Sequence, residues 1–397
     1  MRAVWRSGGG LTLAATVALL TTAACATAAT SAAPGGVHHA ASAAAATPGW
    51  RVVKTFGPDP VNAPSGVLAA VSATDAWSAW SGSRLSVVEH WTGGAWRSVP
   101  VPARLDGYVK TAVSISASSS RDIWLFASYR TTEALRWTGS SWLLQPIPSW
   151  VLRRSSGTLS VTSAVFGAKN VWVFSLGAGG YAAHYDGREW ARVSLPETPV
   201  DVSVAAPDDI WALGPSIGYV MRWNGRKWTT VRLPLLPLRV GESVSYTNIT
   251  AVGPREAWLF RTIRSQNTQL PSTAMMRWNG TSWLTAPSPA DIVGSLIPDG
   301  DGGLWADGID INPGGFWYFY HLSRGHWLQI TPPGVDIHSP EILTQIPGTR
   351  SVWATGSSFG AKGYFGVILK YSPRRLRDLS GAQNPFQVGV DEDSVRV

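Results

Sequence analysis

The stretch from Asp209 to Trp228, Asp-Ile-Trp-Ala-Leu-Gly-Pro-Ser-Ile-Gly-Tyr-Val-Met-Arg-Trp-Asn-Gly-Arg-Lys-Trp, contains three marks that recur along the chain. The first mark is an acidic or turn residue, then any residue, then Trp. The second is a basic-aromatic pair that ends a short apolar strand. The third is a glycine turn followed by Trp. Its Asn-Gly step indicates a hairpin, because both residues tolerate a positive φ.

The first mark occurs seven times, and its tryptophans are separated by 47, 48, 39, 47, 47 and 48 residues. They are Trp77, Trp124, Trp172, Trp211, Trp258, Trp305 and Trp353. With 41 Gly and 27 Pro in the chain, this period predicts a ring of four-stranded β units rather than a solenoid of helices. In the first unit we expect strands at 67–73, 76–80, 85–91 and 96–101. An open array of β units is the alternative.

The split of the last repeat favours a closed ring. The third mark ends six units, at Trp96, Trp142, Trp190, Trp228, Trp283 and Trp327, and the seventh unit runs into Ser372-Pro373 without one. Gly49-Trp50-Arg51-Val52-Val53 stands before the first unit and looks like the missing closing strand. We therefore predict an all-β, seven-bladed β-propeller over 49–373, its last blade closed by the N-terminal strand around Trp50. Such closure removes the open edges that invite aggregation.

Residues 1–25 have the pattern of a secretory signal. Arg2 and Arg6 precede an uncharged core at 11–20, which is too short to span a membrane, and small residues follow. The run Thr22-Ala23-Ala24-Cys25 resembles the bacterial lipoprotein signal, in which the cysteine is lipidated, although that signal usually has Leu where Thr22 stands. The alternative is cleavage at a later Ala-x-Ala site that discards Cys25. Since Cys25 is the only cysteine, the chain cannot form an internal disulfide.

Two segments flank the repeats. Residues 26–48, mostly Ala, Thr, Ser and Gly, suit a flexible tether between membrane and domain. Residues 374–397 are basic and then acidic and have no repeat partner, so we interpret them as a C-terminal tail that can be disordered. We expect the protein to be secreted or lipid-anchored at the outer face of the cell membrane.

The net charge of +8 and the pI of about 9.8 raise the question of anionic partners. Arg and Lys are scattered in pairs or triplets and form no groove-tracking stripe, which argues against nucleic-acid binding. We expect membrane contact only through a lipid on Cys25, and we expect a monomer.

The units resemble the tryptophan-rich propeller repeats, acidic-x-Trp-small-x-Gly followed by aromatic-Asn-Gly-x-x-Trp, of proteins exported by high-GC Gram-positive bacteria. The resemblance covers Trp50 to Tyr371. It implies the fold and export, and it implies nothing about activity. The Gly-x-x-Trp part is also similar to the Asp-box of sialidases, but only in hairpin shape, because Asn224 and Asn279 directly precede the glycine.

Four antiparallel strands per blade place the connections on two faces. The first-to-second and third-to-fourth turns carry the repeated marks, and we interpret this repeat-turn face as structural. The second-to-third loops and the connections between blades form the variable face, whose loops differ in length and chemistry. Binding residues concentrate on irregular loops held by a rigid scaffold. Our candidate binding residues on this face are Tyr108, Trp150, Arg153, Arg154, Arg239, Arg261, Arg264 and Trp317.

Each conspicuous feature also has a structural interpretation. Trp150 and Trp317 can stack on a sugar or anchor a protein, or they can cover neighbouring blades. Residues 298–303, Pro-Asp-Gly-Asp-Gly-Gly, resemble a calcium loop, but they replace the turn before Trp305 and lack a distal Glu, which favours a tight turn. The repeat-position histidines fall in different blades, so we expect no metal site and no cofactor.

No catalytic motif appears in the sequence. A glycosidase needs two carboxylates that flank the scissile bond, and nothing in the chain fixes such a pair; a Gly-x-Ser-x-Gly elbow and a phosphate loop are also missing. We therefore predict an exported, non-enzymatic binding or scaffolding propeller that recognises a glycan or protein on its variable face. The alternative is a carbohydrate-active enzyme, a glycoside hydrolase or lyase, whose catalytic residues are dispersed over several blades.

Overall fold

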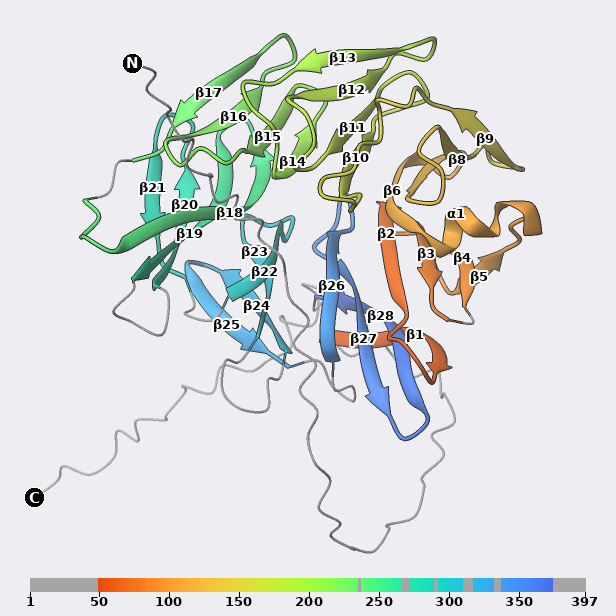
Figure 1. Ribbon diagram of the computed structural model, residues 1–397. Coiled ribbons are helices and arrows are strands. Elements are labelled where there is room, and N and C mark those ends of the chain that lie inside the picture. The colour runs from red at the N-terminus through yellow and green to blue at the C-terminus, as the bar shows by residue number, and fades with distance from the viewer. Residues whose placement is uncertain are drawn as a thin grey trace, which may run out of the picture. The chain divides into compact units, whose positions relative to one another are not determined.

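Short strands separated by the repeated turns form seven four-stranded antiparallel sheets, arranged as a seven-bladed β-propeller (Figure 1). The computed structural model describes residues 49–83, 85–234, 237–265, 272–288, 292–309, 317–331 and 337–373, all in one compact unit of the chain, Ala46–Val397. The predicted fold class is confirmed.

Blades 1 to 6 each use four strands that are consecutive in the chain, and the first strand of each is innermost. Their strands are β2 (Ser65–Ser72), β3 (Asp75–Ser81), β4 (Ser86–Trp91) and β5 (Trp96–Val99); β6 (Ala112–Ser119), β7 (Asp122–Ala127), β8 (Glu133–Trp137) and β9 (Trp142–Pro146); β10 (Val161–Val165), β11 (Val171–Ser175), β12 (Tyr181–Tyr185) and β13 (Trp190–Ser194); β14 (Asp201–Ala206), β15 (Asp209–Leu213), β16 (Tyr219–Trp223) and β17 (Trp228–Arg232); β18 (Glu242–Gly253), β19 (Glu256–Ser265), β20 (Ser272–Trp278) and β21 (Trp283–Ala286); and β22 (Ile292–Pro298), β23 (Leu304–Ile309), β24 (Trp317–Ser323) and β25 (His326–Ile330). A 3-10 helix, η1 (Ala103–Leu105), and a short α-helix, α1 (Asp106–Lys110), connect blades 1 and 2.

Blade 7 joins the two ends of the described chain. Its sheet has the order β1-β28-β27-β26, where β26 is Ile337–Gln345, β27 is Val352–Gly360, β28 is Gly363–Ser372 and β1 is Gly49–Asp59. Strand β1 is outermost and pairs antiparallel with β28, with Trp50 opposite Tyr371. In Figure 1 the red strand β1 lies beside the blue strand β28. The predicted closure by the strand around Trp50 is therefore confirmed.

Buried side chains hold neighbouring blades together. Among the described residues, seven hydrophobic clusters lie one between each pair of adjacent blades. The first-mark tryptophans sit in these clusters, and Trp124, Trp211, Trp305 and Trp353 have no solvent exposure. Burying one such ring removes roughly 150–250 Å² from water, about 4–6 kcal/mol at 25 cal/mol per Å². The first-mark tryptophans therefore stabilise the packing of each blade against its neighbour.

Trp50 takes a side-chain role as well as a strand position. In several blades the first-mark Trp meets the third-mark Trp of the next blade edge-on: Trp77 contacts Trp142 at 6.2 Å between ring centroids, and Trp353 contacts Trp96 at 5.2 Å. Trp50 meets Trp305 in the same way, at 5.3 Å with an interplanar angle of 84°. It therefore acts as the third-mark Trp of blade 7.

Candidate functional site

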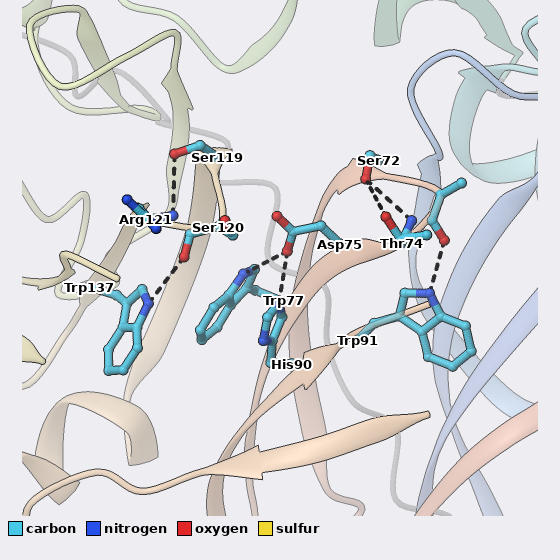
Figure 2. Close-up of polar contacts among 11 residues, drawn as sticks. Ser72, Thr74, Asp75, Trp77, His90, Trp91, Ser119, Ser120, Arg121 and Trp137 are labelled. Atoms are coloured by element: carbon cyan, nitrogen blue, oxygen red, sulfur yellow. Dashed lines mark hydrogen bonds and ion pairs between the residues drawn. The ribbon is translucent and has the colours of Figure 1, made fainter. Parts of the chain in front are cut away.

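The acidic residue of the first mark ties the blade scaffold together (Figure 2). In blade 1, Asp75 Oδ1 accepts a hydrogen bond from Trp77 Nε1 at 3.1 Å and pairs with His90 Nε2 at 2.9 Å. The His90 ring stacks on Trp77 with its centroid 4.1 Å away. Backbone carbonyls of the turns accept hydrogen bonds from the second-mark tryptophans: Trp91 Nε1 donates to the carbonyl of Ala73, and Trp137 Nε1 donates to that of Ser120.

The same acid-Trp-base arrangement recurs around the ring. In blade 4, Asp209 Oδ1 accepts from Trp211 Nε1 and from Arg222 Nε, and the Arg222 guanidinium lies 4.8 Å over the Trp211 ring. Blades 2 and 5 repeat it with Arg136 and Arg277. Blade 3 has Asn170 in place of the acid, bonded to Trp172 and His184. Because one oxygen of each acid bonds to both the Trp and the base of its own blade, we interpret this repeated set as scaffold.

Blade 6 explains the oxygen-rich loop at 298–303. Gly303 stands where the acid should be, and Asp299 supplies the carboxylate instead: its Oδ2 pairs with His321 Nε2 at 2.9 Å. Its Oδ1 accepts from the backbone N–H groups of Asp301 and Gly303, which closes a tight turn. Within the described ranges, no group of three or more His, Cys, Asp or Glu side chains is placed to hold a metal ion.

Exposed apolar side chains are distributed unequally over the molecule. Eleven large hydrophobic residues of the described chain are exposed. Four lie on the outermost strands of blades: Leu143, Leu144, Leu284 and Leu328. The other seven lie on the variable face: Val61, Tyr129, Val200, Ile217, Leu238, Val240 and Phe359. The turns of the repeat-turn face contribute none of the eleven.

Three predicted site residues, Arg153, Arg154 and Trp150, lie over blades 2 and 3, and Tyr108 lies between blades 1 and 2. Arg154 joins two loops over blades 2 and 3, because its Nη2 donates to the carbonyl of Ser128 at 2.6 Å and its Nη1 to that of Gly157 at 3.1 Å. Arg153 is exposed beside it. Tyr108 is buried in α1 and donates a hydrogen bond to Glu133. Burial and this carboxylate raise the pKa of Tyr108 to about 12, so its hydroxyl stays neutral.

Trp150 is half-buried at the outer side of this cluster. Its ring packs against the core between blades 2 and 3, and Tyr181 meets it edge-on at 5.8 Å. Arg192 lies 4.8 Å over both the Trp150 and Tyr181 rings. The Tyr181 hydroxyl donates to the Trp150 carbonyl at 2.9 Å. Trp150 thus contributes packing, and its ring already carries a guanidinium group.

Three other predicted residues, Arg239, Arg261 and Arg264, lie in blade 5 or in the connection that leads into it. They are distant in sequence from the residues over blades 2 and 3 and belong to a different part of the ring. Strands β18 and β19 extend past their neighbours toward the variable face, pairing from Glu242 opposite Ser265 onward. Arg261 is partly buried in this extension, with Nη1 3.6 Å from Met276 Sδ. Arg264 and Arg239 are exposed, and the Arg239 backbone N–H donates to Glu242.

The innermost strands of all seven blades line a central channel of about 610 Å³. Two carboxyl groups lie near the variable-face end of this channel, and no sequence motif had identified them. Asp201 accepts from the Ile249 backbone N–H at 2.9 Å, and burial raises its pKa. Asp307 packs on Gly294, is 5% exposed, and has a pKa raised to about 6 by burial. Asp201 belongs to blade 4 and Asp307 to blade 6, so blade 5 separates them.

Two predicted site residues fall outside this description. Trp317 begins β24, with its backbone opposite Ile309, but its side chain is not among those described. Cys25 and the segments 1–48 and 374–397 lie outside the described residues.

Comparison with known proteins supports the fold alone. No protein-family model and no curated protein sequence matches this chain. Among solved structures, YCF48 bound to D1 peptide is similar with a TM-score of 0.50 and 11% identity, over 81% of this chain and 98% of that one. An oligogalacturonate lyase from Vibrio parahaemolyticus is similar with a TM-score of 0.48 and 8% identity, over 77% of this chain and 89% of that one. The fucose-specific lectin of Aleuria aurantia is similar with a TM-score of 0.40 and 11% identity, over 68% of this chain and 98% of that one.

No helix in the described part of the chain is long and apolar enough to cross a membrane.

Proposed function

We propose that the protein is an exported binding propeller whose variable face recognises a protein or a glycan. The observation that carries the proposal is the placement of seven of the eleven exposed large hydrophobic side chains on that face. Exposed apolar residues grouped on one side of a soluble domain mark interaction surfaces. The repeat-turn face lacks such residues among its described turns, and the first-mark acids there bond to the second-mark bases of the same blades.

The arrangement of the fold suits this role. The seven blades share one scaffold, and loops of different length project from it on one side, so contact residues can vary without loss of the core. Among the similar structures, one is described with a bound peptide. The likeness shows the fold alone, and the binding surface is argued from the exposed residues of this chain.

The test compares two sets of exposed hydrophobic residues. Tyr129→Ser, Ile217→Ser and Phe359→Ser together remove apolar area from the variable face, while Leu143→Ser, Leu284→Ser and Leu328→Ser remove it from outer strands. Exposed substitutions of this kind change stability little, within about 0.5 kcal/mol each. Each protein is applied to a glycan array and used for affinity capture from the cell envelope and medium of the native host. We expect the first variant to lose its partner and the second to keep it. Equal binding by both would contradict the proposal.

A carbohydrate-active enzyme is the second candidate, and the observation that favours it is Asp307. A carboxyl whose pKa is raised to about 6 by burial could act as a general acid near the channel. Incubation with neutral and acidic polysaccharides, followed by assays for reducing ends and unsaturated uronates, tests this function. Turnover that Asp307→Asn abolishes would favour the enzyme over the binding protein.

A further inference from the structure

The two faces of the propeller differ in exposed charge as well as in apolar area. On the variable face most exposed charged side chains of the described chain are basic: Arg104, Lys110, Arg130, Arg153, Arg154, Arg239, Arg264 and Lys362. One acid is exposed among them, Asp106, whose side chain is 38% exposed and forms an ion pair with Lys110. The repeat-turn face also has exposed bases, but exposed acids accompany them: Asp186, Glu189, Asp208 and Asp301. The variable face is therefore electrostatically complementary to an acidic partner.

The densest group of these bases spans the loops of blades 2 and 3, and we call Arg130, Arg153 and Arg154 the basic patch. Arg154 is fixed between the loops by its bonds to Ser128 and Gly157. Arg130 follows two residues after Ser128, and its guanidinium lies 5.5 Å over the exposed ring of Tyr129. On the other side, Arg153 Nη1 lies 3.4 Å from the position that a Cβ on Gly179 would occupy, so that arginine reaches the next loop of blade 3.

The basic patch keeps hydrogen-bonding capacity for a ligand. Within the described ranges, no carboxylate forms an ion pair with any of its three arginines. Each guanidinium has five N–H groups in a planar fork, and Arg154 uses two nitrogens to hold its loop. A carboxylate is the group that such a fork binds best, through paired, charge-assisted hydrogen bonds.

The neighbouring aromatic rings distinguish between classes of acidic partner. A sugar binds by stacking on an open ring face, and each ring here already carries a guanidinium group over one face: Arg192 over Trp150 and Tyr181, and Arg130 over Tyr129. The exposed apolar residue Val200 follows Pro199, whose carbonyl accepts a hydrogen bond from Gly177 in the blade 3 loop, and its aliphatic side chain offers no stacking surface. Carboxylates interspersed with apolar side chains, as in a polypeptide, match this surface better than a uronate chain does.

We propose that the basic patch binds the carboxylates of an acidic polypeptide segment, with the surrounding exposed apolar residues contacting its hydrophobic side chains. This inference rests on the proposed binding function of the variable face and names the chemistry of its partner.

The experiment measures binding of a fluorescein-labelled peptide, four repeats of Glu-Glu-Leu, to the full chain by fluorescence anisotropy. The same peptide with Gln in place of Glu and an oligogalacturonate are the comparison probes. Arg130→Gln combined with Arg153→Gln removes two charges from the basic patch without touching the loop contacts of Arg154. Arg188→Gln combined with Arg226→Gln removes two exposed charges from the repeat-turn face and is the matched control.

We expect the Glu peptide to bind, the Gln peptide to bind at least tenfold more weakly, and the basic-patch variant to lose about tenfold in affinity per arginine, as for charge-assisted bonds of about 1.5 kcal/mol. The affinity of the control variant for the Glu peptide should stay within about twofold of the wild-type value. Equal losses in both variants would mean non-specific attraction to a basic protein and would overturn the inference. Tighter binding of oligogalacturonate than of the Glu peptide would overturn it in favour of a glycan. If the Glu peptide does not bind while the serine variants described above still separate the two surfaces, the inference fails and the proposed function stands.

Discussion

Asp307 shows how a single buried group sets the pH dependence of this scaffold. Its side chain lies on the backbone of Gly294, and its Oδ1 is buried without a hydrogen-bond partner. Because burial raises its pKa from 3.8 to about 6, the folded protein holds a proton that the unfolded chain has released. The contribution of Asp307 to stability is therefore complete below about pH 4 and is lost as the pH rises through 6.

The substitution Asp307→Asn tests this linkage, because the amide stays neutral at every pH. We expect the variant to gain stability relative to the wild type between pH 4 and pH 8, by up to about 3 kcal/mol. Urea unfolding at the two pH values measures the difference. A stability difference that is the same at pH 4 and pH 8 would show that Asp307 titrates normally.

His184 gives a second residue-scale prediction, with the opposite sign. Burial lowers its pKa, so the folded protein resists protonation and loses stability as the pH falls below 6.5. Its partner is Asn170 Oδ1 at 2.9 Å, where blade 1 has Asp75 at the same distance from His90. Asn170→Asp should raise the pKa of His184 and stabilise the protein at pH 5 relative to pH 8 by about 1 kcal/mol. An NMR titration of the histidine, with the wild type as control, measures the direction; a further fall in that pKa would contradict the prediction.

At the scale of elements, the sequence located the strands because the marks are local signals. In blade 1 the expected strands at 67–73, 76–80, 85–91 and 96–101 compare with β2 to β5 at 65–72, 75–81, 86–91 and 96–99. The turn residues between them fix the backbone wherever they occur, so each unit could be recognised from its own residues.

The site was less accessible to sequence reasoning because its contacts join distant segments. The arginines at 153 and 154 were recognisable as a pair, but the bond from Arg154 to Ser128 spans two blades and leaves no local pattern. Tyr108 resembled an exposed loop residue, whereas α1 buries it against the core between blades 1 and 2. Asp201 and Asp307 are single carboxyls whose pKa values depend on burial by neighbouring strands.

The closing strand β1 gives the element-scale prediction. Trp50→Ala should destabilise the protein by about 3–5 kcal/mol, because the cavity would open between Trp305 and the stacked ring of Phe319. Trp142→Ala in blade 2 removes a third-mark Trp of equal exposure, 4%, and is the matched control. We expect similar losses of melting temperature for the two variants, and deletion of residues 49–53 should cost more than either. An unchanged melting temperature after the deletion would refute closure by β1.

For the whole molecule, the lipid attachment that we propose and the recognition that we propose fall on opposite faces. Gly49 begins β1 opposite Ser372, at the end of blade 7 that belongs to the repeat-turn face. A tether that enters there leaves the variable face, with its exposed apolar and basic residues, on the side away from the attachment point. If residues 26–48 form the tether that their composition predicts, a flexible chain of that length has an end-to-end distance of roughly 25 Å.

Modification of Cys25 would decide whether the whole protein stays at the membrane. We propose that this cysteine is lipidated. Mass spectrometry of the protein from its native host should find a diacylglyceryl group on an N-terminal Cys25, and the wild type should partition with membranes. Since stable anchoring by acyl chains depends on that one side chain, Cys25→Ser should release the protein into the medium with its melting temperature unchanged. Thr22→Leu, which restores the usual lipoprotein signal, should leave the protein with the membranes and serves as the control. A mature N-terminus beyond residue 25 would instead mean that the propeller is freely secreted, with the same variable face exposed.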